Sequence, residues 1–206
     1  MHSYKLRKLE IALLLALAAA LIWGAWSLQR QDNLERKMIR LHVIANSDDP
    51  ADQTLKLQVR DRVLALATDI LRSSADMDQA RTRLTHALPD LESAAAEEIA
   101  RRGCDYPVKA SLERTEFPLK TYDGFALPAG EYTALRLVIG EGKGQNWWCV
   151  VFPPLCTSAA TDLPETAIAA GLDEEDVSLI TEEDTGYVLK FRSVELWERL
   201  RQWLGK

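Results

Sequence analysis

Residues 140–156, GEGKGQNWWCVVFPPLC, gather residue types that carry chemistry in other proteins. Two of the three cysteines and two of the six tryptophans lie here, and three glycines surround Lys143. A phosphate-binding loop would need Gly-Lys-Ser/Thr leading into a helix. Here the lysine lies between glycines and a strand pattern follows, so the spacing favours a flexible turn.

Cys149 could act as a nucleophile with His42 as its base, because the two partners need not be close in sequence. No sequence motif supports this pairing, and a cysteine within a strand more often serves packing. Cys149 and Cys156 flank Pro153 and Pro154, and a bend there could bring the cysteines within disulfide reach. This pairing stays open and would require a domain outside the cytoplasm.

Metal ligands are not expected either. His86 has no partner at metal-ligand spacing. Asp48, Asp49 and Asp52 lack the glycine and terminal glutamate of a calcium-binding EF-hand loop. Helix capping explains these three aspartates better, with Asp49 as the cap and Pro50 at the first helical position.

Alternating apolar residues on both sides of the glycine-rich turn predict two strands and therefore a β-hairpin. Adjacent residues of a strand point to opposite faces. One of Trp147 and Trp148 can therefore serve the core, while the other is free to face a partner.

The elements around this hairpin predict an α+β fold, in which helices pack on one face of a largely antiparallel sheet. A strand over 38–46 precedes a helix from about 50 to 72. This helix has two apolar stripes, so we expect it to lie between the sheet and a second helix. Alternatively, one of the two stripes binds a partner protein. Ser74 is expected to cap the next helix and Pro89 to end or kink it, with a third helix following. Strands are expected over 106–117, 131–139 and 146–152, so the core domain covers residues 38–156.

The two ends of the chain have different characters. Residues 11–28 are uncharged, follow a basic start and predict a membrane-length helix, either an uncleaved anchor or a cleaved signal peptide. The length of the run favours the anchor, and residues 29–37 form a polar linker.

Residues 157–206 carry five Lys/Arg against eleven Asp/Glu. They read as an acidic connector, with a short strand over 177–180, then a strand over 186–191 and a helix after Ser193 that pack on the core. No clustered basic face for nucleic acid is evident.

Three segments resemble a known family. IRLHVIANSDDPADQTLKLQVRD, LPAGEYTALRLVIGEGKGQNWWCVVFPPLC and KFRSVELWERL resemble stage II sporulation protein R of endospore-forming Firmicutes. The N-terminal hydrophobic segment matches as well, whereas the connector 157–182 does not.

The resemblance implies a signalling protein and not an enzyme. Members are made in the forespore and exported into the intermembrane space, either membrane-anchored or secreted. There they trigger an aspartic-type protease of the septal membrane, which processes the precursor of the mother-cell sigma factor E. No cofactor, small-molecule substrate or nucleic acid is implied, and residues 11–28 supply the membrane contact.

The matched motifs suggest which residues to probe for partner binding. These are His42, Asn46, Asp48, Trp147, Trp148, Pro153 and Pro154. Two other functions are weighed against the signalling role. One is a membrane-anchored extracytoplasmic hydrolase using Cys149, and the other is a structural module of the cell envelope.

Overall fold

The computed structural model describes residues 2–122, 124–155 and 163–181. The chain divides into two compact units, residues 1–34 with 185–206, and residues 35–184. Helix α1 (His2–Arg36) belongs mainly to the first unit and includes the segment 29–36 that was expected to be a linker. Its stretch Glu10–Arg36 is long and apolar enough to cross a membrane, and the large apolar side chains from Ile11 to Trp26 are exposed.

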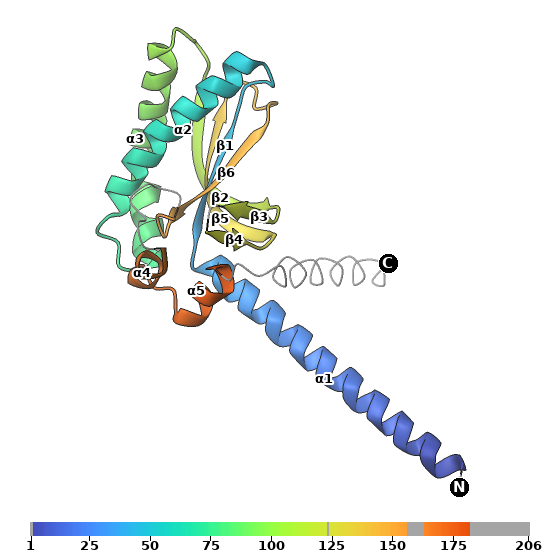
Figure 1. Ribbon diagram of the computed structural model, residues 1–206. Coiled ribbons are helices and arrows are strands. Elements are labelled where there is room, and N and C mark those ends of the chain that lie inside the picture. The colour runs from blue at the N-terminus through green and yellow to red at the C-terminus, as the bar shows by residue number, and fades with distance from the viewer. Residues whose placement is uncertain (1, 123, 156–162, 182–206) are drawn as a thin grey trace. The chain divides into compact units, whose positions relative to one another are not determined.

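The second unit is built on a four-stranded sheet. Its strands are β1 (Ile39–Ile44), β2 (Val108–Phe117), β5 (Gly130–Ile139) and β6 (Asn146–Phe152), in the order β2-β5-β1-β6. β1 pairs parallel with β5, whereas the β1–β6 and β2–β5 pairs are antiparallel. Helices α2 (Pro50–Leu71) and α3 (Met77–Arg101) cover one face (Figure 1). The short pair β3 (Lys120–Tyr122) and β4 (Phe125–Leu127) lies on the opposite side. The predicted α+β class is confirmed.

The predicted hairpin between β5 and β6 is wrong, because β1 lies between these two strands. All six residues of β1 are buried, including Arg40 and His42. A strand whose side chains are buried on both faces is best placed in the middle of a sheet. The connection 140–145 therefore passes the end of β1 instead of forming a tight turn.

The core lies between the sheet and the two helices. Leu41 and Val43 of β1 pack against Val59 and Val63 of α2 and against Leu84 of α3, all fully buried. α2 is thus covered by both the sheet and α3, as its two apolar stripes predicted.

Two expectations about α3 are wrong. The helix continues through Pro89, so the expected end of the helix there and the third helix after it are wrong. Pro89 is exposed, so the carbonyl that loses its partner faces water, while the buried Leu84 and Leu91 hold both halves on the core. The helix is capped by Asp76 and not by Ser74, since the Asp76 carboxylate accepts a 2.8 Å hydrogen bond from the Gln79 amide.

Two short helices, α4 (Leu163–Ala169) and α5 (Glu174–Thr181), follow β6 in the described residues. The strand expected over 177–180 is therefore wrong. Asp173 and Asp176 form a reciprocal cap, because each side chain accepts a hydrogen bond from the other residue's amide. The strand expected over 186–191 and the helix expected after Ser193 lie outside the described residues.

Candidate partner-binding surface

The connection 140–145 is fastened to the segment that follows β1. Asn46 Oδ1 accepts a 2.9 Å hydrogen bond from the Glu141 amide, and Asp48 Oδ1 accepts a 2.7 Å bond from the Gln145 amide. Asn46 Nδ2 also donates to Asp52 at 2.8 Å. The helix-capping interpretation of these aspartates is corrected by this geometry. Asp49 does occupy the N-cap position of α2, but it makes no side-chain capping bond.

The glycines of this connection permit close approach between segments. Gly140 has φ +58°, and a Cβ atom there would lie 2.1 Å from Asn46 Oδ1. A Cβ atom on Gly144 would lie 2.2 Å from the carbonyl oxygen of Ser47. The glycine-rich stretch is thus a tightly packed crossover and has no helix N-terminus with which to hold a phosphate.

Asp52 is the buried centre of this connection. Its carboxylate accepts a 2.6 Å hydrogen bond from Ser47 Oγ in addition to the bond from Asn46, and the Ser47 bond chiefly holds the pKa of Asp52 below its ordinary value. Within the described residues, no group of three His, Cys, Asp or Glu side chains could hold a metal ion. Asp52 holds Asn46 and Ser47 in place beside the crossover.

His42 and Trp148, both predicted as binding residues, lie together on the sheet face away from α2 and α3. Their rings stack with centroids 4.0 Å apart, and Phe117 packs edge-on against Trp148 at 4.7 Å. His42 is 5% exposed, and its burial lowers the pKa of the imidazole. The ring is consequently neutral at pH 7 and acts as a packing group.

Arg40 was missed as a site residue. Its side chain is fully buried on the same face, and its guanidinium lies 4.0 Å from the ring centroid of Phe117 and 4.8 Å from that of Tyr132. Arg40 Nη2 donates a 2.6 Å hydrogen bond to Tyr122 Oη of β3. The available signal was a charged residue in a strand whose other residues, apart from His42, are all apolar. Arg40 thereby fastens β3 to the sheet.

Trp147 points to the opposite face, as the alternation of strand residues predicted. Its ring is 37% exposed, and the Arg60 guanidinium of α2 lies 4.2 Å from the ring centroid. A groove of about 530 Å³ runs past both tryptophans, between the first half of α2 and β3. The edge of the sheet at β6 thus combines an exposed aromatic ring with a hollow of ligand size.

The proline pair lies apart from the tryptophans. Pro153 follows Phe152 through a cis peptide bond at the far end of β6, roughly 16 Å from Trp148 at the usual rise of a strand. Pro154 lines a different cavity, of about 380 Å³, together with Phe152 and residues of α2 and α4. The predicted binding residues therefore separate into a group at the start of β6 and a pair at its end.

The geometry does not assemble a catalytic pair from Cys149 and His42. Cys149 is 3% exposed and lies opposite Leu41 on the face covered by α2 and α3. His42 points to the other face of the neighbouring strand. Cys156 lies outside the described residues, so the Cys149–Cys156 pairing stays a prediction.

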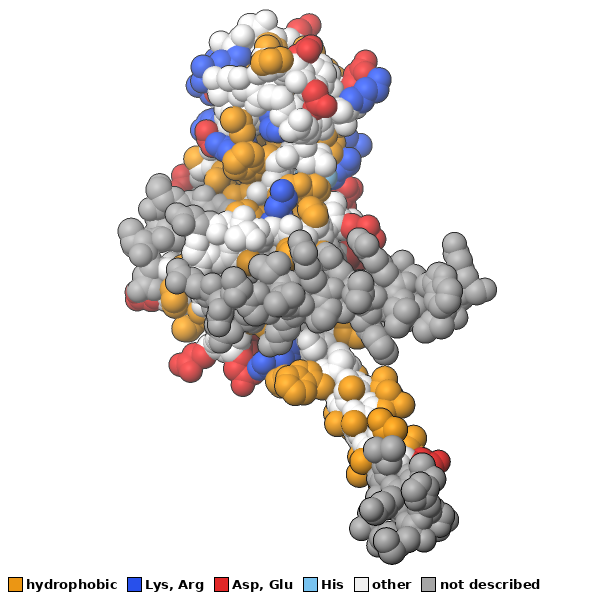
Figure 2. Space-filling view, turned by 45° about the vertical axis from the view of Figure 1, so that its right-hand side comes forward, with side chains coloured by type: hydrophobic (Ala, Val, Ile, Leu, Met, Phe, Trp, Pro, Cys, Tyr) orange, Lys and Arg blue, Asp and Glu red, His pale blue; other side chains and the backbone are white. Residues whose placement is uncertain are grey.

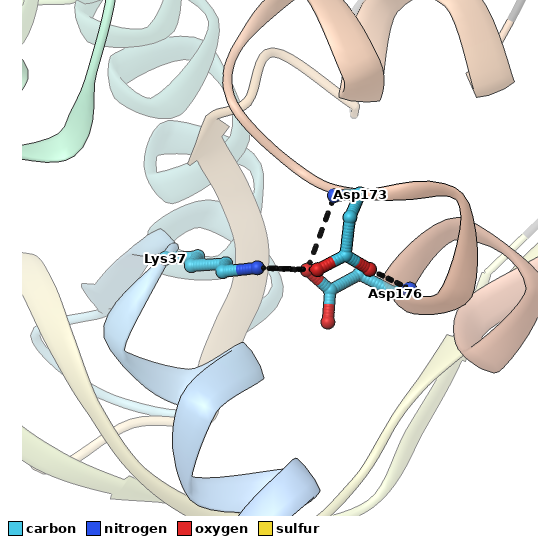
Figure 3. A network of polar contacts seen from close by, with 3 residues as sticks. All are labelled: Lys37, Asp173 and Asp176. Atoms are coloured by element: carbon cyan, nitrogen blue, oxygen red, sulfur yellow. Dashed lines mark hydrogen bonds and ion pairs between the residues drawn. The ribbon is translucent and has the colours of Figure 1, made fainter.

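A small polar network lies where the chain leaves α1. The Lys37 ammonium pairs with the carboxylates of Asp173 and Asp176, the two residues of the α5 cap (Figure 3). Asp176 is largely buried, and the hydrogen bond from Lys37 is the main cause of the lowered pKa of Asp173. The network ties α5 to the short connection between α1 and β1.

These features define an α+β protein, in which a compact domain follows a helix long and apolar enough to cross a membrane. The family description "Stage II sporulation protein R" matches residues 35–162, so the chain belongs to that family. It is 38% identical over 118 residues to "Stage II sporulation protein R" of Bacillus subtilis (strain 168). That alignment covers 57% of this chain and 53% of the relative, so the match spans about half the length of the relative. No solved structure matches the chain.

Proposed function

We propose that this chain is an exported signalling protein of sporulation. It is made in the forespore and delivered to the intermembrane space, where it activates the septal membrane protease that processes the sigma factor E precursor. The proposal includes either a retained anchor or a cleaved signal at residues 11–28, with residues 38–156 as the signalling domain.

The observation that carries this proposal is where the family match falls. Residues 35–162 contain the whole four-stranded sheet, helices α2 and α3, and the groove beside β6. The match thus falls on the sheet and the two helices that cover it, which supports a shared role for this part of the domain. The apolar helix before it supports export or anchoring, and its basic start favours that end in the cytoplasm.

The hydrolase alternative has no support from the geometry, because Cys149 is buried in the core and His42 faces away from it. The envelope-module alternative is favoured by no particular contact of the described residues. Neither is therefore proposed as a second function.

Deleting the gene in the spore-forming host tests the proposal. The mutant is expected to enter sporulation, complete the septum and accumulate unprocessed sigma factor precursor on an immunoblot. Supplying the full chain from a forespore promoter should restore processing. Normal processing in the deletion strain would overturn the proposal.

A further inference from the structure

We propose that the groove beside β6 binds an extended, acidic segment of a partner protein, which adds to the sheet as a further strand along residues 146–148. The inference goes beyond the proposed function and does not rest on it, since binding can be measured without protease or sigma factor. The partner is defined by its chemistry: an extended backbone that carries carboxylates.

The position of β6 provides the backbone contacts. Among the residues that the structure describes, β6 is the terminal strand of the four-stranded sheet, next to β1. A strand at a sheet edge presents main-chain N–H and C=O groups to which an extended peptide can pair. The proposal concerns only the first three residues of the strand, Asn146, Trp147 and Trp148, which line the groove.

The groove provides room for such a strand. It measures about 530 Å³ and is bounded by Lys56 and Leu57 of α2 on one side and by Lys120 of β3 on the other. Pockets of 300–1,000 Å³ are the usual size for bound ligands. Side chains of an added strand would point alternately toward α2 and toward β3. Trp147 and Trp148 point to these same two sides, so each presents a ring to one set of peptide side chains.

The positive charge of the groove favours an acidic segment as its ligand. The charged residues that line the groove are Lys56 and Lys120, and no Asp or Glu among the described residues lines it. Neither lysine has a carboxylate within salt-bridge distance in the described part of the chain, whereas Arg60, which lies beside Trp147, is paired with Asp61 at 2.6 Å. A basic groove stands out in a chain of net charge −6. Figure 2 shows one face of the molecule, on which hydrophobic side chains are interspersed with basic and acidic ones.

Lys56 is held at the wall of the groove by hydrogen bonds to neighbouring residues. Its ammonium donates hydrogen bonds to Gln53 Oε1 at 2.6 Å and to the Gln145 carbonyl at 2.9 Å. It is 4% exposed, and burial lowers its pKa. A carboxylate entering the groove would stabilise the charged form and gain a charge-assisted contact.

Peptide binding to the full chain in detergent micelles tests the proposal. The probe is a fluorescein-labelled nine-residue peptide of alternating valine and glutamate, followed by anisotropy. Two matched peptides carry lysine in place of glutamate, or proline in place of the three central valines. The first control reverses the charge and the second removes the strand-forming backbone. The acidic peptide is expected to bind at least tenfold more tightly than either control.

Charge-reversal variants locate the site. Lys120→Glu should weaken binding of the acidic peptide at least fivefold, while Lys109→Glu, an exposed residue on the opposite edge strand β2, should leave it unchanged. Lys120→Gln serves as a milder variant if the reversal disturbs the fold, and circular dichroism checks each protein. Equal effects of the Lys120 and Lys109 variants would overturn the proposal.

A membrane surface is the competing occupant for a basic groove. Vesicles containing phosphatidylglycerol therefore form a further arm of the test. Lys120-dependent binding to these vesicles without binding of the acidic peptide would contradict the proposal. Equal binding of all three peptides would contradict it as well.

Discussion

Gly144 is the residue on which the crossover from β5 to β6 depends most directly. The connection approaches the backbone of Ser47 so closely that a Cβ atom on Gly144 would lie 2.2 Å from the Ser47 carbonyl oxygen. This contact is made to backbone, which cannot rotate away as a flexible side chain would.

Gly144→Ala is consequently expected to destabilise the domain by about 2–3 kcal/mol, because the crossover or the end of β1 must shift. Urea unfolding monitored by tryptophan fluorescence measures the change. Gly103→Ala is the matched control. Gly103 has φ +76° and open space around it, so only backbone strain of about 1 kcal/mol is expected. A cost for Gly144→Ala no larger than that of the control would contradict the close approach.

His42 should make the stability of the domain depend on pH. Its folded-state pKa lies below the ordinary value of 6.5, so the unfolded chain binds more protons as the pH falls. The contribution of the neutral ring is present above pH 6.5 and is lost as the pH falls through the folded-state pKa.

His42→Phe keeps a ring for stacking on Trp148 and should lose less stability than the wild type between pH 7 and pH 5. Urea unfolding at several pH values measures this difference. His86→Gln, at an exposed position on α3, should keep the wild-type pH dependence. Identical slopes for His42→Phe and the wild type would show that His42 is not the titrating group.

Residue-level reasoning succeeded where it needed only local geometry. The opposite faces of Trp147 and Trp148 follow from strand alternation alone. The roles of Asn46 and Asp48 could not be predicted from strand alternation. Both side chains bind the connection 140–145. This connection reaches them only because β1 lies between β5 and β6. The close packing of Arg40 on Phe117 and Tyr132 likewise depends on strands that are distant in sequence.

At the level of elements, α3 contains a proline in its interior, where proline is unfavourable. Pro89 is exposed in the middle of the helix, removes one backbone hydrogen bond and contributes little packing. Pro89→Ala should therefore stabilise the domain by about 1–3 kcal/mol, after allowing for the greater freedom of the unfolded chain.

Urea unfolding of Pro89→Ala beside Ser93→Ala provides the measurement. Ser93 is also exposed on α3, and its change should be within about 0.5 kcal/mol. A destabilised Pro89→Ala protein would mean that the proline holds a bend that the packing requires.

The contact between Lys37 and α5 is a second prediction at this level. Lys37→Met removes the cation that binds Asp173 and Asp176, while the reciprocal cap within α5 stays intact. The free energy of local opening of α5 should fall by about 1 kcal/mol, since Asp176 is largely buried but Lys37 is partly exposed.

Hydrogen exchange of the α5 amides reports this opening. Lys143→Met removes an exposed pair with Glu141 and should leave the exchange of α5 unchanged. Unchanged exchange of α5 in Lys37→Met would show that the cap alone fixes this helix.

Periodicity located the long elements, because α2, α3 and the long strands bury apolar residues at regular spacing, but it did not locate the short elements β3, β4 and α4. The order of the strands could not be read in the same way. Sequence neighbours usually pair, and the glycine-rich connection between β5 and β6 looks like a hairpin turn. The insertion of β1 becomes evident only when both of its faces are known to be buried. α5 was mistaken for a strand because its apolar residues, from Val177 to Ile180, are too few to show a period.

For the whole molecule, family membership and the apolar N-terminal helix together lead to the proposed exported signal. The family match covers the sheet with α2 and α3, and the helix that could cross a membrane lies almost entirely before it. On this account the domain acts only after it has left the compartment in which it is made.

The most direct test of this account replaces the N-terminal segment in a deletion strain and follows sigma factor processing. The full chain, the chain without residues 1–28, and the chain with an unrelated export signal in place of residues 1–28 are each produced in the forespore. The full chain and the chain with the substituted signal should restore processing, while the truncated chain should leave the precursor uncleaved at equal protein level. Processing restored by the truncated chain, or by none of the three, would contradict the account.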